Sequence, residues 1–142
     1  MEPVRFKKLI PDVKTPSYGT PEAAGLDIYA GEDRIIAPGE HTTVRSGVAI
    51  AIPKGFTGLI WDKSGVAFRG LKTMGGVFDS DYRGEIVVIV KNVTDKPFEI
   101  KKNTKLTQML FHPIEQAQIE VTDDWDTATT RGEGRFGSTG LH

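Results

Sequence analysis

The stretch Gly75–Val90, which reads GGVFDSDYRGEIVVIV, indicates both how this chain folds and where it keeps reactive side chains. Its second half, Glu85–Val90, is apolar almost throughout, as expected for a strand buried on both faces of a packed double sheet or barrel. Its first half combines glycines with two carboxylates, Asp79 and Asp81. This layout suits a hairpin whose backbone approaches a ligand closely and aims an acid at it. An isolated Asp-x-Asp is more often a solvated turn. Whether this stretch binds a ligand must therefore be judged from other parts of the chain.

Similar strand-like segments follow one another along most of the chain. Sixteen glycines and eight prolines separate them, and turn residues bound them. Strands are expected at Val4–Ile10, Ile28–Ala30, Arg34–Ile36, His41–Val44, Gly47–Ile52, Thr57–Trp61, Glu85–Lys91, Phe98–Ile100, Leu106–Phe111 and Gln118–Val121. Gly47–Ile52, like Glu85–Val90, is expected to be buried on both faces. A single short helix is expected at Ser64–Gly70. Many short strands at regular spacing predict an all-β sandwich, barrel or jelly roll.

Composition narrows the class of protein. At 142 residues, the chain is expected to form one β domain over residues 1–122. A net charge of −1 gives no support for binding to nucleic acid or to an anionic membrane. The absence of cysteine excludes disulfides, thiolate nucleophiles and the cysteine-ligated zinc of nucleobase deaminases. No apolar run approaches the ~18 residues of a membrane helix, and the first residues lack a signal-peptide core. We therefore expect a soluble, cytoplasmic protein.

Residues 123–142 differ from the rest, because they are polar and rich in glycine. Such a segment has too little apolar surface to pack by itself and is expected to be a mobile arm. Trp125 and Phe136 nevertheless give it two large aromatic side chains. The arm is therefore a candidate for folding over a ligand.

Several familiar motifs fail. Gly132–Gly137 matches G-x-G-x-x-G, but no strand precedes it and too few residues follow it for a dinucleotide-binding fold. The Asp-x-Asp of the opening stretch begins like an EF-hand loop, but Val90 stands where the bidentate glutamate is required. A P-loop is absent, and His41, His112 and His142 are too scattered for a metal cluster or a serine-type triad.

Five separated patches remain, and each carries groups suited to a phosphorylated ligand. The first has an acid, Asp27, in a strand, and the second has Lys63, Ser64 and Gly65 at the start of the expected helix. Helix starts favour phosphate because their N–H groups are free. Taken singly, Asp27 could be a turn acid and Ser64 an N-cap.

The third patch is the opening stretch, the fourth is a strand carrying the amide of Gln108, and the fifth is the glycine-rich arm with Arg131. Gln108 alone could be a surface amide, and the arm alone could be disordered. Five such patches in one short all-β chain are hard to explain as coincidence.

With these five patches in this order, the sequence resembles the trimeric-type dUTP pyrophosphatases (deoxyuridine triphosphate nucleotidohydrolases) over nearly its whole length. The most specific matches are Gly76–Gly84 and the arm sequence RGEGRFGSTG. The resemblance implies a distorted jelly-roll, β-clip-like barrel and a homotrimer with three active sites at its subunit interfaces. It also implies Mg²⁺-dependent hydrolysis of dUTP to dUMP and pyrophosphate, which limits uracil incorporation into DNA and supplies dUMP for thymidylate synthesis.

The resemblance assigns roles within the opening stretch. Asp79 would orient and deprotonate the attacking water, and the hairpin backbone at Gly76, Val77 and Phe78 would bind the uracil edge. Tyr82 would lie against the deoxyribose and leave no room for a 2′-hydroxyl. Asp81, Arg83 and Gly84 are expected to hold the shape of the hairpin.

It also assigns roles outside that stretch. Lys63, Ser64 and Gly65 would bind the phosphates with help from Gln108, and Asp27 would hold Mg²⁺ through water. The arm would close over the active site of a neighbouring subunit. There Arg131 would neutralise charge on the leaving pyrophosphate, Phe136 would cover the uracil, and Gly137, Ser138 and Thr139 would lie near the γ-phosphate.

The chain departs from the family pattern at two charged positions. Lys63 stands where arginine is usual, which keeps the charge but loses the bidentate fork. Arg135 stands where glycine is usual, and it could add a phosphate contact or alter closure of the arm. Alternatives to dUTP hydrolysis are a dCTP deaminase of the same fold, a non-catalytic nucleotide-binding regulatory module, and a structural jelly roll.

Overall fold

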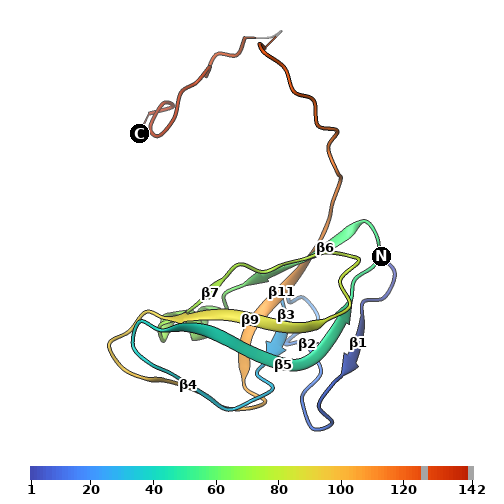
Figure 1. Cartoon of the computed structure of the whole chain (residues 1–142), viewed down its shortest axis with the longest axis vertical. Coiled ribbons are helices and arrows are strands. Elements are labelled where there is room, and N and C mark those ends of the chain that lie inside the picture. Colours follow the sequence, from blue (N-terminus) through green and yellow to red (C-terminus); the bar gives the residue numbers. More distant parts are fainter. Residues whose placement is uncertain (126–127, 141–142) are drawn as a thin grey trace.

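A computed structural model describes residues 1–125 and 128–140 as a β body followed by a long tail (Figure 1). The elements are β1 Arg5–Lys8, β2 Ser17–Tyr18, β3 Leu26–Tyr29, β4 Arg34–Ile36, β5 His41–Ala51, β6 Phe56–Trp61, α1 Ser64–Phe68, β7 Leu71–Met74, β8 Val77–Phe78, β9 Glu85–Asn92, β10 Phe98–Ile100 and β11 Lys105–Pro113. The all-β prediction with one short helix is confirmed. Among the described residues, no helix has the length and apolar character needed to cross a membrane.

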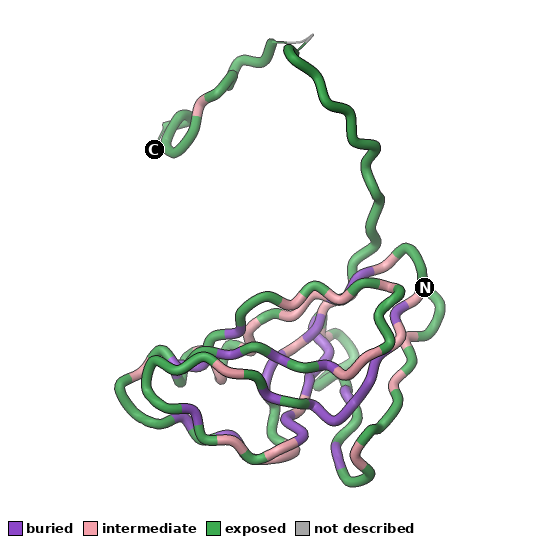
Figure 2. Tube along the Cα trace, viewed as in Figure 1, coloured by how far each residue is buried: buried purple, intermediate pink, exposed green. Residues whose placement is uncertain are grey.

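Two main sheets enclose one core. One has four strands in the order β1-β5-β9-β7, and the other has five in the order β2-β3-β11-β6-β8; β10 and β4 pair separately. The buried hydrophobic residues of the core come from strands of both sheets. The buried segments, purple in Figure 2, lie in the body and not in the tail. The largest fully buried side chains include Ile28, Ile36, Ile50, Ile86 and Met109. Burial of apolar surface at ~25 cal/mol per Å² is the main force that holds the two sheets face to face.

Strand β9 has one buried and one uncovered face. Ile86, Val88 and Val90 point into the core, whereas Val87 and Ile89 are 37% and 42% exposed. The prediction that this strand is buried on both faces was therefore wrong. It failed because Val87 and Ile89 remain partly exposed on the outer face of β9 in the described part of the chain.

The other differences from prediction concern where strands end and which segments are strands. The segments predicted at His41–Val44 and Gly47–Ile52 form one strand, β5, which ends at Ala51. This strand continues through an irregularity in its pairing with β9, where Gly47 has a φ of 72°. Strands β2, β7 and β8 were not predicted. Gln118–Val121 is not a strand, because no strand among the described residues pairs with it; Ile119 is 88% exposed.

The opening stretch of the sequence connects the two sheets. Strand β7 pairs with β9 in the four-stranded sheet, with Met74 opposite Ile89, and the chain then crosses to pair β8 with β6 in the five-stranded sheet. Gly75 and Gly76 make this crossing with φ angles of 70° and 113°. Ile60 donates its backbone N–H to the Gly76 carbonyl at 2.8 Å. The predicted hairpin is thus formed by β7 and β9, with β8 inserted in its connection.

The tail leaves the body after β11. The N–H of Ile114 donates to the carbonyl of Gly55 at 2.9 Å, and the chain then leads away from both sheets (Figure 1). Nearly all of its described residues are exposed (Figure 2). Asp126, Thr127, Leu141 and His142 lie outside the described residues, and they include parts of the expected arm and one of the three histidines.

Replacement of Gly76 by alanine is expected to destabilise the fold. A Cβ at Gly76 would lie 2.6 Å from the Cβ of Ile60, and the φ of 113° is unfavourable for any L side chain. Together these effects should lower the free energy of unfolding by about 3 kcal/mol, measured by urea denaturation. Gly39→Ala is the control: its φ is 72°, but a Cβ there meets nothing within 4 Å, so the loss should be nearer ~1 kcal/mol. Equal losses in both variants would contradict the explanation that a Cβ at Gly76 is too close to Ile60.

Candidate active site

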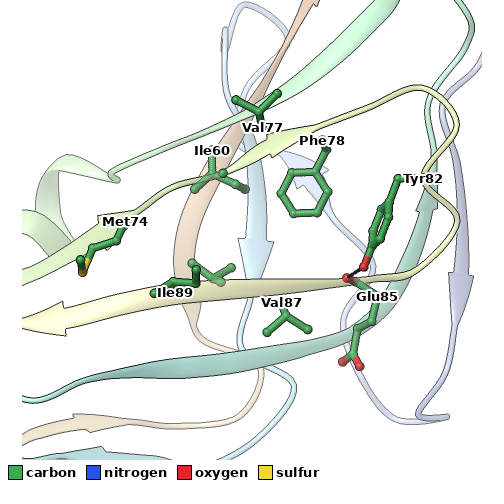
Figure 3. Close-up of a pocket in the computed structure, with 10 residues that line it drawn as sticks. Ile60, Met74, Val77, Phe78, Tyr82, Glu85, Val87 and Ile89 are labelled. Atoms are coloured by element: carbon green, nitrogen blue, oxygen red, sulfur yellow. Dashed lines mark hydrogen bonds between the residues drawn. The ribbon is translucent and has the colours of Figure 1, made fainter.

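The opening stretch forms one wall of a small cavity of about 210 Å³ on the outer side of β9 (Figure 3). Its lining comprises Ile60, Met74, Gly76, Val77, Phe78, Tyr82, Glu85, Val87, Val88 and Ile89. The walls are mainly apolar side chains and strand backbone. A flat, partly apolar ring such as a pyrimidine suits such a cavity, provided that backbone groups can satisfy its polar edge.

Strand β8 supplies those backbone groups. It is the last strand of its sheet, so only one of its edges is paired within the chain. The carbonyls of Gly76 and Phe78 face β6, where they accept hydrogen bonds from the Ile60 N–H and the Thr57 hydroxyl, both at 2.8 Å. Since successive residues of a strand direct their backbone groups to opposite edges, Val77 presents its N–H and C=O outward. A donor and an acceptor are therefore available beside the cavity.

Tyr82 is held in place over this cavity. Its hydroxyl donates to the backbone carbonyl of Glu85 at 2.8 Å, as the dashed line in Figure 3 shows. Its ring meets the ring of Phe78 edge to face, with centroids 5.7 Å apart. A Cβ at Gly84 would lie 2.3 Å from the Tyr82 hydroxyl, so only glycine leaves room for the ring. Tyr82 thus acts as a fixed wall.

The turn before Tyr82 carries Asp79. The N–H of Tyr82 donates to the Asp79 carbonyl at 3.1 Å, and the guanidinium of Arg83 donates to the carbonyls of Ser80 and Tyr82 at 2.7 and 2.8 Å. Arg83 and Gly84 therefore hold the shape of the hairpin, as predicted. The Asp79 side chain is exposed and borders a second, wider hollow that is also lined by Lys54. It is accessible to water and to a ligand.

A second group of polar residues lies on the same sheet as β8, but around β3 and β11. We call it the basic cluster, and it consists of Asp27, Lys63, Lys105 and Gln108. The Lys63 ammonium lies 2.7 Å from Oδ1 of Asp27, and the Lys105 ammonium lies 2.8 Å from Oδ2. The Asp27 side chain is only 3% exposed. These residues border a hollow of about 430 Å³ together with Gly19, Thr20, Ala23, Ala24 and Gly25.

Lys105 is the member of the basic cluster that was not predicted. In a regular strand, Lys105 and Gln108 would point to opposite faces, because side chains alternate. The pairing of β11 with β3 shifts between Lys105 and Thr107, so one residue is inserted. This β-bulge turns Lys105 toward the Asp27 side chain. The sequence pattern alone contains no clear signal for it.

Gln108 and Asp62 fix the entry to helix α1. The amide nitrogen of Gln108 donates to the Asp62 carbonyl at 2.9 Å, while its amide oxygen lies so close to Gly25 that a Cβ there would be 2.1 Å away. The Asp62 carboxylate accepts from the N–H and hydroxyl of Thr73 at 2.8 and 2.6 Å and also pairs with Lys72. Lys63 is consequently held at the N-cap of α1, followed by Ser64 and Gly65, which are exposed.

The basic cluster keeps Asp27 ionised. Burial alone would raise the pKa of the Asp27 carboxyl, but the hydrogen bonds and charges of Lys105 and Lys63 hold that pKa below its ordinary value. The hydrogen bond to Asp27 in turn raises the pKa of Lys105. At neutral pH, the cluster therefore contains one anion and two cations.

Asp27 does not fit a magnesium site in this geometry. Mg²⁺ requires oxygen ligands and keeps several waters, but ammonium groups already occupy both carboxylate oxygens of Asp27. Within residues 1–125 and 128–140, no group of three or more His, Asp or Glu side chains could hold a metal ion. The metal role that the resemblance gives to Asp27 stays a prediction without geometric support.

One chain does not bring the predicted site residues together. Asp27 lies on β3 and Val77 on β8, which are separated by β11 and β6 and therefore by ~14 Å at ordinary strand spacing. The tail residues Arg131 and Gly137–Thr139 are exposed, and Phe136 is fully exposed. The chain thus carries the small cavity beside Val77, the basic cluster and the tail as three separate parts.

Comparison with known proteins identifies the family of the chain. The sequence profile of the dUTPase family matches residues 12–140. The chain belongs to the dUTPase family. The deoxyuridine 5′-triphosphate nucleotidohydrolase of Nautilia profundicola is 43% identical over 141 residues, which cover 96% of this chain and 98% of that protein.

Solved structures with a similar fold come from the same family. The dUTPase of Staphylococcus bacteriophage 80alpha with dUpNHpp has a TM-score of 0.92 at 24% identity, covering 99% of this chain and 100% of that one. A mutant dUTPase from phage phi11 of S. aureus, described with a structural Mg(II) ion, has a TM-score of 0.82 at 21% identity over 88% of this chain and 99% of that one. These likenesses confirm the predicted dUTPase jelly-roll fold.

Proposed function

We propose that this protein hydrolyses dUTP to dUMP and pyrophosphate, as the family name implies. One observation carries the assignment of substrate: the unpaired backbone edge of Val77 faces an apolar cavity that the fixed ring of Tyr82 closes. Uracil offers the complementary donor and acceptor, and the tyrosine ring leaves little space for a 2′-hydroxyl on the sugar. This arrangement supports a deoxyuridine nucleotide as ligand.

The proposed reaction is attack of water on the α-phosphorus. Asp79 takes a proton from the water, whose oxygen forms a bond to that phosphorus while the bond to the bridging oxygen of the β-phosphate breaks. The electron pair leaves with pyrophosphate, and Lys63 and Arg131 neutralise its charge. Ser64, Gly65 and Gln108 hold the phosphates, and the tail with Phe136, Gly137, Ser138 and Thr139 excludes other water.

A homotrimer with shared sites is part of the proposal. It is supported by the separation of the base-binding cavity from the basic cluster within one chain. In such a trimer, the tail of residues 123–142 reaches the site of a neighbouring subunit.

Two further expectations accompany this function. Dependence on Mg²⁺ stays a prediction, and no step is assigned to the metal, because Asp27 does not fit as its ligand. A cytoplasmic location also stays a prediction. It suits an enzyme that limits uracil incorporation into DNA and supplies dUMP for thymidylate synthesis.

The substrate is tested by comparing dUTP with dTTP, dCTP and UTP, with and without Mg²⁺, while counting released pyrophosphate. Turnover should favour dUTP by at least ~10-fold over each alternative, because the cavity and Tyr82 select both base and sugar. Release of ammonia from dCTP would instead identify a deaminase, and equal turnover of UTP would contradict the role of Tyr82.

Asp79→Asn is expected to lower dUTP turnover by ~10²–10⁴-fold, which is the usual contribution of a general base. Binding of dUpNHpp, measured by calorimetry, should persist because the cavity is unchanged. Asp81→Asn is the matched control and should retain turnover near that of the wild type. Near-wild-type turnover of Asp79→Asn would remove Asp79 from the role of base.

A chain ending at Thr130 is expected to fold normally and to lose at least ~100-fold in turnover, because the ligand is no longer enclosed. Co-expression of this truncated chain with Asp79→Asn, using two affinity tags, gives mixed trimers. About one site in three should then regain an intact Asp79 and an intact tail, by the symmetry of a closed trimer. Purified mixed trimers that stay as inactive as each variant alone would show that the tail serves its own chain.

A further inference from the structure

The proposed mechanism gives roles to Lys63 and Gln108 of the basic cluster, but none to Asp27 or Lys105. Two lysines flank one aspartate, so the cluster carries a net charge of +1. The Lys63 and Lys105 side chains are 30% and 46% exposed, whereas that of Asp27 is 3% exposed. The anion is thus buried beneath two cations that reach solvent. A ligand entering this hollow meets positive charge first.

Asp27 orients both lysines. An ammonium group has three donors, and one from each lysine is directed at Asp27. Apart from Lys105, Oδ2 of Asp27 has no polar partner within the described residues. A long lysine side chain loses rotamer freedom when it is ordered, and the ion pair has already ordered it before any ligand arrives. The remaining donors are free for a ligand.

The walls of the hollow leave room for such a ligand. Gly19 lies over the ion pair, since a Cβ there would be 3.6 Å from Oδ2 of Asp27 and 3.8 Å from Nζ of Lys105. Thr20, Ala23 and Gly25 form the rest of that side, and all are small. A hollow of about 430 Å³ with a positive floor and small walls accommodates a chain of phosphates.

We infer that Lys105 is a binding residue for the polyphosphate end of the nucleotide, and that Asp27 is a positioning residue that holds Lys63 and Lys105 as a two-cation receptor. This inference rests on the proposed dUTP substrate. It gives Asp27 a different role from that of a magnesium ligand. Any metal would then enter with the phosphates and not through Asp27.

The test measures binding of two ligands, dUpNHpp and dUMP, by titration calorimetry in EDTA and in Mg²⁺. Lys105→Gln should weaken dUpNHpp binding by ~10–100-fold, the usual effect of losing a charged hydrogen bond, and change dUMP binding by less than ~3-fold. Lys105→Arg should restore binding of dUpNHpp to within ~3-fold of the wild type. Thermal denaturation of each variant checks that it folds.

Lys101→Gln is the matched control, because Lys101 pairs with exposed Glu99 and does not border the hollow. It should bind both ligands as the wild type does. Unchanged dUpNHpp binding by folded Lys105→Gln, or an equal loss for dUMP, would overturn the role of Lys105. Failure of the wild type to bind dUpNHpp would instead contradict the proposed function itself.

Asp27→Asn separates positioning from metal binding. If Asp27 positions the lysines, the ratio of dUpNHpp affinities in Mg²⁺ and in EDTA should stay within ~2-fold of the wild-type ratio, because Asp27 contacts no metal. If Asp27 holds the metal, this ratio should fall toward one. The latter outcome would overturn the positioning role and restore the magnesium assignment.

Discussion

The close contact between Gly76 and Ile60 is the constraint on which the candidate site depends. The chain must leave the four-stranded sheet after Met74 and reach the five-stranded sheet by Val77, within two residues. Only a backbone with positive φ and no side chain makes that crossing so close to β6. The crossing places β8 at a sheet edge, and this edge position leaves the Val77 backbone free. The way in which the two sheets are joined therefore determines the backbone edge that the proposed base recognition uses.

The same sheet carries two chemically different halves of a site that do not meet. At one edge, the cavity beside Val77 is mainly apolar and closed by Tyr82; around β3 and β11, the basic cluster is charged. A nucleoside triphosphate has both characters in one molecule. Their separation within the single chain supports the proposed homotrimer with shared sites.

Much of the fold could be predicted from sequence, because glycine, proline and asparagine mark most strand ends. Sequence failed where long-range pairing decides the structure. The two residues of β8 are a strand only because β6 lies beside them, and Gln118–Val121 has the composition of a strand without a neighbour. For the site, the five patches could be identified from the sequence, but which of them lie close together could not. Lys105 was missed because the β-bulge that aims it at Asp27 arises from pairing with β3.

The buried position of Asp27 is hard to explain by stability alone. Taking the Asp27 carboxylate out of water costs several kcal/mol, and apolar residues of similar size usually serve stability as well or better. The cluster contributes more favourable free energy when it binds a polyphosphate, because its two lysine side chains are already ordered before binding. The buried acid also prevents the two lysines from repelling one another while the hollow is empty. A substrate site can contain groups that lower stability but are already arranged for binding. Because the exposed charges of this cluster are two cations, they favour an anionic ligand such as phosphate.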